Sequence, residues 1–379
     1  MLSTTVPGSV RDRVVPTTAE YSRLVEALAT YQALAAAGGW EVIPAGEAVK
    51  PGETDARLPA LRRRLMVTGD LGSAAGDSVF DAGLQGALAR FQTRHGIDAD
   101  STLGEDTMAA LNVTVAQRIR QIQLSLERWR WLPNELGERY IFVNIPAYMV
   151  YGFTGAGQAL AMKVVVGAEY GGRQTPVFSD VMDHVIFHPY WNVPESIATS
   201  EMLPQMRRNA SWLSRRGYEV INGSGNVVNA GSVNPNEIES GRMRIRQKPG
   251  PANALGLVKF MFPNPHGIYL HDTPSDQLFA RTERGISHGC IRLEDPPLFA
   301  EFVLGRQGWS MERINEAIAS EEQQTVTIDQ PIPVYLMYMS AFVTPEGAIS
   351  FRNDIYGNDA VLDEALTARA AGWPARTSP

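Results

Sequence analysis

Residues 267–292 read GIYLHDTPSDQLFARTERGISHGCIR and contain Cys290, the single cysteine of the 379-residue chain. Apolar and polar residues alternate at the start of this stretch. The alternation predicts a strand that places Tyr269 and His271 on one face and its aliphatic residues in the core. One cysteine cannot form an intrachain disulfide or a Cys-rich zinc ribbon. The stretch therefore predicts a strand histidine near a lone thiol.

The thiol of Cys290 has the neighbours that nucleophilic catalysis requires. Sulfur attacks as a thiolate, which a nearby imidazole favours by accepting the proton. His271 is the candidate base, and we expect the sulfur to be ionised beside it. Gly289 has no Cβ, which permits a tight turn that aims backbone amides. We expect the amides of Gly289 and Cys290 to form an oxyanion hole.

The composition is that of a globular protein. Hydrophobic residues make up 44% and charged residues 20% of the chain, which excludes wholesale disorder. Lys plus Arg number 34 and Asp plus Glu 41, so the net charge is −7 and no nucleic-acid partner is expected. No run approaches the roughly 18 apolar residues of a membrane helix, so we expect a soluble chain.

The chain length predicts two or three domains, at about 150 residues per domain. The pattern changes from helical to β-rich near Arg139. We expect a helical scaffold segment over 1–52, a compact three-helix module over 53–113, a linker helix over 114–135, and a β-rich domain over 136–379 with a mainly helical and loop insertion over 193–245. The fold class is thus α+β and multidomain.

Local signals predict where three helices begin or end. Thr114 and Gln117 have the spacing of a capping box. Gly96 is placed to end the helix before it. Asp295 precedes two prolines and is a candidate N-cap.

The phrase FDAGLQGALARFQTRHGIDADSTLGEDTMAALN, residues 80–112, resembles the three-helix peptidoglycan-binding module of many cell-wall enzymes. The matching features are a Phe-Gln pair, His-Gly-Ile, Leu-Gly and a closing Ala-Leu-Asn. The alternative is a helical spacer with the same turn and core signals.

The region around Cys290 resembles the YkuD-type L,D-transpeptidases. Their signature is a histidine, a gap of somewhat under twenty residues, and then Ser/Thr-His-Gly-Cys followed by an apolar residue and Asn or Arg. Here these are His271 and Ser287 to Arg292. The similarity extends over about residues 19–360 and is greatest to the larger Gram-negative members, which have a scaffold, a peptidoglycan-binding module and a capping insertion.

The resemblance implies acyl transfer in peptidoglycan without a metal or organic cofactor. Cys290 would attack the carbonyl of the L-centre of meso-diaminopimelate in a tetrapeptide stem and expel D-alanine. The amine of a second stem would resolve the thioester, giving a 3→3 cross-link. The carbonyl of Asp272 would orient His271. The resemblance also implies that carbapenems acylate the sulfur.

Further residues are candidates for substrate binding. Tyr190, Trp191 and Asn192 lie between a strand and the insertion and are either walls of the stem-peptide groove or ordinary core residues. Arg292 either binds a substrate carboxylate or braces its loop. Tyr269, Ser287 and His288 complete the set, and His288 is placed less well than His271 to act as the base.

Three other functions remain open. His266, His271, His288 and Cys290 could form a zinc site, although their spacing is unfamiliar and no acidic base stands near. The chain could also be a wall-binding scaffold without catalysis. A carboxypeptidase or cross-link hydrolase would use the same thioester with water as the acceptor. The polar insertion over 193–245 is a candidate lid.

The expected partners are the stem peptides and glycan of peptidoglycan. Relatives usually begin with a further helical region and an export signal, which residues 1–17 do not resemble. We therefore expect a trimmed chain from a periplasmic or cell-envelope protein, with any membrane anchor supplied by a missing N-terminus.

Overall fold

A computed structural model describes residues 16–209, 211–229 and 233–372. Parts of the predicted scaffold, insertion and β-rich domain, namely residues 1–15, 210, 230–232 and 373–379, lie outside the described residues. The chain divides into two compact units. The helical unit comprises 1–136, 144–147 and 337–379, and the sheet unit comprises 137–143 and 148–336. The predicted α+β organisation is confirmed.

The helical unit is built around a leucine-rich core. Its helices are α2 (Ala19–Ala36), α3 (Leu58–Val67), α4 (Ala82–His95), α5 (Glu105–Asn112), α6 (Val115–Trp129) and α12 (Asn358–Gly372). Leu61, Leu88, Phe91 and Leu111 are wholly buried where α3, α4 and α5 meet. The helix signals of the sequence are confirmed, since Thr114 and Gln117 form a capping box and Gly96 ends α4 at φ +67°.

The C-terminal segment belongs to the helical unit, which differs from the predicted domain over 136–379. From Met337 onward it contributes the hairpin β14 (Ala341–Val343) and β15 (Ile349–Phe351), then α12. Ala341 N–H donates to Ser125 Oγ of α6 at 3.0 Å. A buried ion pair joins Arg128 of α6 to Asp359 of α12. These long-range contacts tie the segment to helices that precede the sheet, which local sequence patterns could not reveal.

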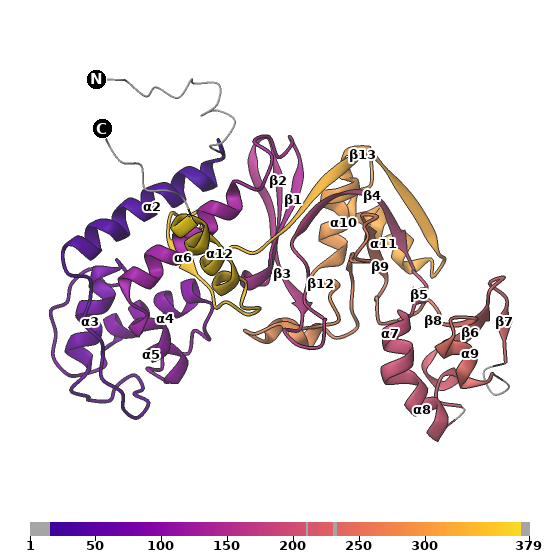
Figure 1. Ribbon diagram of the computed structural model, residues 1–379, viewed down its shortest axis with the longest axis horizontal. Coiled ribbons are helices and arrows are strands. Elements are labelled where there is room, and N and C mark those ends of the chain that lie inside the picture. The colour runs from indigo at the N-terminus through magenta and orange to yellow at the C-terminus, as the bar shows by residue number, and fades with distance from the viewer. Residues whose placement is uncertain (1–15, 210, 230–232, 373–379) are drawn as a thin grey trace. The chain divides into compact units, whose positions relative to one another are not determined.

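The sheet unit contains a nine-stranded sheet in the order β11-β3-β12-β10-β9-β4-β13-β1-β2, and β2 also pairs with β3, so the sheet closes on itself (Figure 1). The strands are β1 (Tyr140–Asn144), β2 (Met149–Thr154), β3 (Gly157–Gly167), β4 (Phe178–Phe187), β9 (Val258–Met261), β10 (Leu270–His271), β11 (Gly285–Ser287), β12 (Ile291–Leu293) and β13 (Gln324–Met337).

Two helices follow β12 in the sheet unit, α10 (Pro296–Leu304) and α11 (Met311–Ala319). Asp295 accepts from Leu298 N–H and caps α10, as predicted. Phe299 of α10 meets Phe260 of β9 edge to face at 4.8 Å between ring centroids. This aromatic contact anchors α10 against the strand beside β10.

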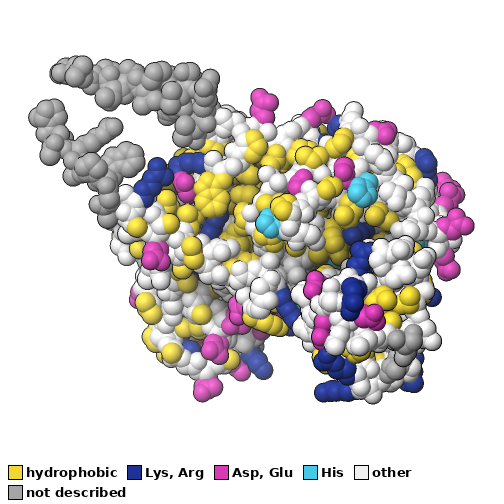
Figure 2. All heavy atoms as spheres, turned by 45° about the vertical axis from the view of Figure 1, so that its right-hand side comes forward, with side chains coloured by type: hydrophobic (Ala, Val, Ile, Leu, Met, Phe, Trp, Pro, Cys, Tyr) yellow, Lys and Arg dark blue, Asp and Glu magenta, His cyan; other side chains and the backbone are white. Residues whose placement is uncertain are grey.

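The insertion leaves the sheet after β4 and returns at β9, as a lobe visible at the right of Figure 1. Its short helices were predicted, but its four-stranded sheet β5-β8-β6-β7 was not. Its elements are β5 (Trp191–Asn192), α7 (Glu195–Ile197), η2 (Ala198–Met202), α8 (Leu203–Arg208), β6 (Tyr218–Asn222), β7 (Val227–Val228), α9 (Pro235–Glu239) and β8 (Met243–Gln247). Figure 2 shows Lys and Arg side chains at the lower end of the insertion. The exposed arginines of the insertion include Arg207, Arg208, Arg215 and Arg216.

Short turns complete the described structure, namely η1 (Ile145–Ala147), η3 (Ser214–Arg216), η5 (Asp276–Ala280) and η6 (Gly305–Gln307). Within the described ranges, every helix is too short or too polar to cross a membrane.

The buried ion pair of the helical unit gives a test of its packing. Arg128 is 2% exposed, so Asp359→Ala would leave its guanidinium buried without a counter-charge. We expect a loss of about 3–5 kcal/mol in the free energy of unfolding. The control is Asp363→Ala, which lies on α12 like Asp359 and breaks a partly exposed pair with Arg120 of α6. It should cost less than about 1 kcal/mol. Urea unfolding measures both losses, and equal losses would contradict the packing described.

Candidate active site

The pairing of β10 with its two neighbours brings the predicted residues together. β10 runs parallel to β12 with His271 opposite Arg292, and antiparallel to β9 with His271 opposite Lys259. Ile291 N–H donates to the Tyr269 carbonyl at 3.1 Å, which places Cys290 opposite Tyr269 in the same register. Side chains two residues apart share a face of a strand. Cys290 and His271 are thus diagonal neighbours on one face of the sheet.

His271 is held as a neutral imidazole with a defined tautomer. Its side chain is buried, and Nδ1 lies 2.5 Å from the carbonyl oxygen of Asp272. A carbonyl only accepts, so Nδ1 carries the proton and the lone pair is on Nε2. Burial, reinforced by the charges of Arg292 and Lys259, lowers the pKa of His271 to about 3. The side chain is therefore ready to accept a proton at neutral pH.

The resting thiol is protonated. Burial raises the pKa of Cys290, while hydrogen bonding by Tyr269 and the charges of Lys259 and Arg292 oppose that rise. The sulfur donates to the Gly267 carbonyl at 3.7 Å. The predicted ionised thiolate is therefore not the resting state, because burial penalises the charged forms of both the thiol and the imidazole.

The turn before Cys290 is fixed by its own hydrogen bonds. Gly289 has φ +116°, a conformation that favours glycine. Its N–H donates to Ser287 Oγ at 3.0 Å, and the same hydroxyl donates to the Cys290 carbonyl at 2.6 Å. In this structure the Gly289 amide is thus bonded to Ser287, and the buried Ser287 hydroxyl supports the turn before Cys290. The roles of Gly289 in an oxyanion hole and of Ser287 in substrate binding stay predictions.

Two cations lie on either side of His271, namely Arg292, which was a predicted site residue, and Lys259, which was not. Among the described residues the Arg292 guanidinium has no hydrogen-bond partner, and its buried Nε is unsatisfied. Lys259 Nζ lies 3.8 Å from the centroid of the Tyr269 ring. Burial lowers the pKa of Lys259. A charged residue inside the apolar run LGLVKFMF is the signal that could have identified it.

His288 contacts the insertion. Its Nε2 lies 2.7 Å from Glu201 Oε1, and Arg173 donates to the same oxygen at 2.6 Å. Glu201 lies in η2 of the insertion, whereas Arg173 lies in the loop between β3 and β4. His288 therefore connects the turn before Cys290 to the insertion, a contact that differs from the substrate contact we expected.

The three residues before the insertion have different surroundings. Burial, reinforced by Cys290, raises the pKa of Tyr269 well above its usual value, and hydrogen bonding by Trp191 opposes that rise. Tyr190 lies under the Arg246 guanidinium at 4.4 Å, and Asn192 is exposed on β5. The structure thus brings Trp191, but not Tyr190 or Asn192, to the residues around Cys290.

The histidines of the alternative zinc site have other neighbours. His266 packs against the Phe178 ring at 4.9 Å, and His288 is bonded to Glu201. Across the described parts of the chain, no three His, Cys, Asp or Glu side chains are grouped as metal ligands.

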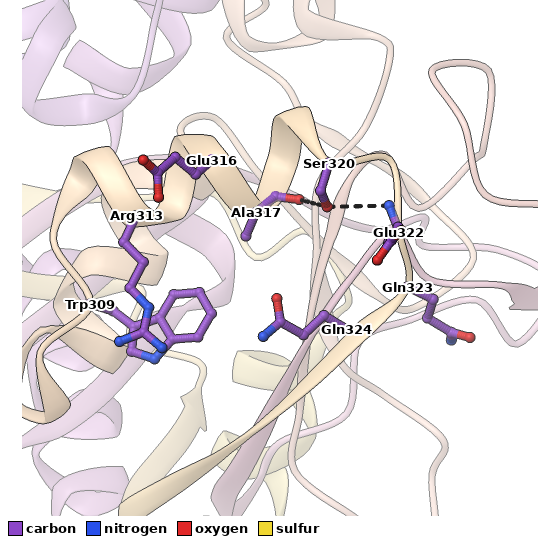
Figure 3. A pocket seen from close by; sticks show the side chains of 8 residues that line it. All are labelled: Trp309, Arg313, Glu316, Ala317, Ser320, Glu322, Gln323 and Gln324. Atoms are coloured by element: carbon purple, nitrogen blue, oxygen red, sulfur yellow. Dashed lines mark hydrogen bonds between the residues drawn. The ribbon is translucent and has the colours of Figure 1, made fainter.

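A hollow of about 450 Å³ lies elsewhere in the sheet unit (Figure 3). Its residues come from α11 and the adjoining segments, with Arg313 over the ring of Trp309 at 4.2 Å. Glu316 and Gln324 also line it. None of the predicted site residues does, so this hollow is separate from the candidate active site.

Comparison with known families agrees with the geometry. The model of the YkuD family, described as the L,D-transpeptidase catalytic domain, matches residues 138–328, half of the chain. The chain therefore belongs to the YkuD family of L,D-transpeptidases. The model named "Putative peptidoglycan binding domain" matches residues 54–111, as the resemblance of the helical module implied.

Individual proteins are also similar. A Haemophilus influenzae protein named "Putative L,D-transpeptidase" is 33% identical over 247 residues, which cover 65% of this chain and 49% of the relative. The chain thus spans about half the length of that curated relative.

Among solved structures, an L,D-transpeptidase of Xylanimonas cellulosilytica matches 78% of this chain and 99% of its own, with 15% identity and a TM-score of 0.24. One of Stackebrandtia nassauensis matches 76% and 94%, with 13% identity and a TM-score of 0.30. At such TM-scores the family assignment rests on the sequence match.

Because Cys290 and His271 are both neutral at rest, the rate of Cys290 alkylation should depend on pH in a defined way. Since burial raises the pKa of the thiol, its alkylation by iodoacetamide should accelerate steadily as the pH rises above about 8, without a plateau near neutrality. Intact mass reports this reaction directly because the chain has one cysteine. A rate that is already maximal at about pH 6 would instead show a resting thiolate–imidazolium pair.

Proposed function

We propose that this chain is a peptidoglycan L,D-transpeptidase that works through a Cys290 thioester. The observation that carries the proposal is the strand register that sets Cys290 and His271 on one face, with the imidazole neutral and oriented. The donor is a tetrapeptide stem. Its reacting carbonyl belongs to the L-centre of meso-diaminopimelate.

In the first half-reaction, Nε2 of His271 accepts the thiol proton while the Cys290 sulfur attacks the donor carbonyl. The tetrahedral oxyanion then collapses, the bond to D-alanine breaks, and the imidazolium returns the proton to the leaving amine. In the second half-reaction, the side-chain amine of another stem attacks the thioester. This step forms the 3→3 amide cross-link and restores the thiol.

Substrate charge would strengthen the base. Arg292 and Lys259 lower the pKa of His271, and Arg292 has no partner among the described residues. A stem-peptide carboxylate bound to Arg292 would offset its charge and thereby make the imidazole more basic. A guanidinium suits this role because its planar fork matches a carboxylate. Substrate binding and proton transfer would thus be coupled through Arg292.

The insertion would act as a lid through one carboxylate. Glu201 accepts from Arg173 and lies within hydrogen-bond distance of His288, two residues before the nucleophile. Its position ties η2 to both the β3–β4 loop and the turn before Cys290. Opening the insertion would break both contacts, and closing it would re-form them over the site.

The helical module and the family suggest the setting. We propose that the module contacts glycan and keeps the enzyme on peptidoglycan in the periplasm or cell envelope, where it would contribute to cell shape. By the same reasoning, carbapenems would acylate Cys290, since their strained carbonyl accepts the attack that the stem carbonyl accepts.

Substitution of the pair tests the mechanism. Cys290→Ala should abolish cross-linking of disaccharide-tetrapeptide, and His271→Ala should lower its rate by at least about 10²-fold, because the thiol loses its base. Product masses distinguish dimer, tripeptide and exchanged D-amino acid. Turnover retained by Cys290→Ala would refute the nucleophile. Tripeptide as the main wild-type product would indicate a hydrolase that uses the same thioester.

Glu201→Gln tests the lid. The amide keeps the shape of the side chain but removes the charge that binds Arg173 and His288. We expect KM for the donor stem to change by several-fold while the unfolding temperature stays the same, because the pairs are partly exposed. Glu195→Gln, an exposed carboxylate in α7, is the matched control. Identical kinetics in the two variants would contradict a lid held by Glu201.

A further inference from the structure

The backbone of Gly289 and Cys290 has four polar groups, and three of them are bonded. Gly289 N–H donates to Ser287 Oγ at 3.0 Å, and the Cys290 carbonyl accepts from the same hydroxyl at 2.6 Å. The Gly289 carbonyl accepts from Thr175 Oγ1 at 2.7 Å. Among the bonds of the described residues, the Cys290 N–H has no acceptor. The only unpaired group of the four is therefore the amide beside the nucleophilic sulfur.

Thr175 is built into the fold as a two-way bridge. Its hydroxyl accepts from Gly167 N–H at 2.9 Å and donates to the Gly289 carbonyl, which can only accept. The side chain is 1% exposed. It thus links the end of β3 to the turn before Cys290, from the loop between β3 and β4.

The loop that carries Thr175 is held close against β3. A Cβ added at Gly167 would lie 1.9 Å from the carbonyl oxygen of Arg173, so only glycine permits this approach. The loop also closes on the turn, since a Cβ added at Gly289 would lie 3.6 Å from the same oxygen. The position of the Thr175 hydroxyl is therefore determined by packing on both sides.

A hydrogen bond to the carbonyl of a peptide group also fixes the direction of its N–H. The Gly289–Cys290 peptide is trans and planar, so its carbonyl and its N–H point in opposite directions. Holding the Gly289 carbonyl on Thr175 directs the Cys290 N–H away from Thr175. A backbone amide aimed in advance in this way stabilises an oxyanion without reorganisation during the reaction.

We infer that Thr175 is a positioning residue that aims the Cys290 N–H at the oxyanion formed when the sulfur attacks an acyl carbonyl. This inference rests on the proposed acyl transfer and adds a residue to it. Thr175 touches neither substrate nor sulfur in this account. It acts through the Gly289–Cys290 peptide alone.

Two reactions of the Cys290 sulfur distinguish the aiming of the Cys290 N–H from a general effect of Thr175 on the thiol. Acetylation by p-nitrophenyl acetate proceeds through an oxyanion: the sulfur bonds to the acetyl carbon, and the C–O bond to p-nitrophenolate breaks. Alkylation by iodoacetamide displaces iodide and forms no oxyanion. A misdirected Cys290 N–H should therefore slow acetylation and leave alkylation unchanged. A displaced thiol, or a thiol with an altered pKa, should slow both reactions.

Thr175→Val keeps the shape of the side chain and removes its hydroxyl. We expect Cys290 acetylation to slow by about tenfold or more, since losing an oxyanion donor outright costs about 10²–10³-fold. Alkylation should stay within about twofold of wild type. Thr175→Ser keeps the hydroxyl and should restore acetylation. Thr325→Val, at an exposed threonine of β13, is the matched control and Cys290→Ala gives the background.

Thermal unfolding confirms that each variant is folded, and Thr175→Ala replaces the valine variant should that one not fold. Unchanged acetylation, or an equal loss in both reactions, would overturn the inference. Failure of serine to restore acetylation would also overturn it. Neither reagent contains a stem peptide, so the outcomes of this experiment do not depend on the proposed transpeptidase function. Failure of that function would appear separately, as absence of cross-linking by the wild-type chain.

Discussion

The parallel pairing of β10 with β12 is the constraint on which the site depends. Local chain geometry cannot bring residues 271 and 290 together, because η5 and β11 lie between them in the chain. The register does so by placing His271 opposite Arg292. A slip of one residue would turn Cys290 to the other face of the sheet and bury its sulfur in the core. Leu270 and Ile291, both wholly buried, prevent such a slip.

Burial then sets the charge state of the paired residues. It raises the pKa of the Cys290 thiol and lowers that of the His271 imidazole, so both are neutral at rest. The cations beside them, Lys259 and Arg292, favour anions. The site is therefore arranged for negative charge that arises on the sulfur, on the attacked carbonyl or on a bound carboxylate. Before substrate binds, the site holds no thiolate–imidazolium pair. The thiolate forms only as His271 accepts the thiol proton during attack on the substrate.

The sequence predicted the features whose determinants are local. The capping box at Thr114 depends on two residues of one turn, and the contact of His271 with the Asp272 carbonyl joins neighbouring residues. The pairing of His271 with Cys290 was expected from the family signature rather than from local geometry. Contacts between distant segments could not be predicted in this way. Thr175 reaches the active-site turn across 114 positions of sequence, and Asp359 reaches α6 across 231. The charge state of the thiol was also missed, since burial is a property of the folded chain.

The proposed mechanism depends on the passage of an acyl group through a thioester on Cys290. The most direct measurement is the intact mass of the chain after rapid mixing with disaccharide-tetrapeptide and acid quenching, followed by mapping of the modified peptide. The mechanism predicts an adduct equal in mass to the donor minus D-alanine, confined to the peptide that contains Cys290. Cross-linked product formed without any such adduct, or an adduct on another residue, would contradict it.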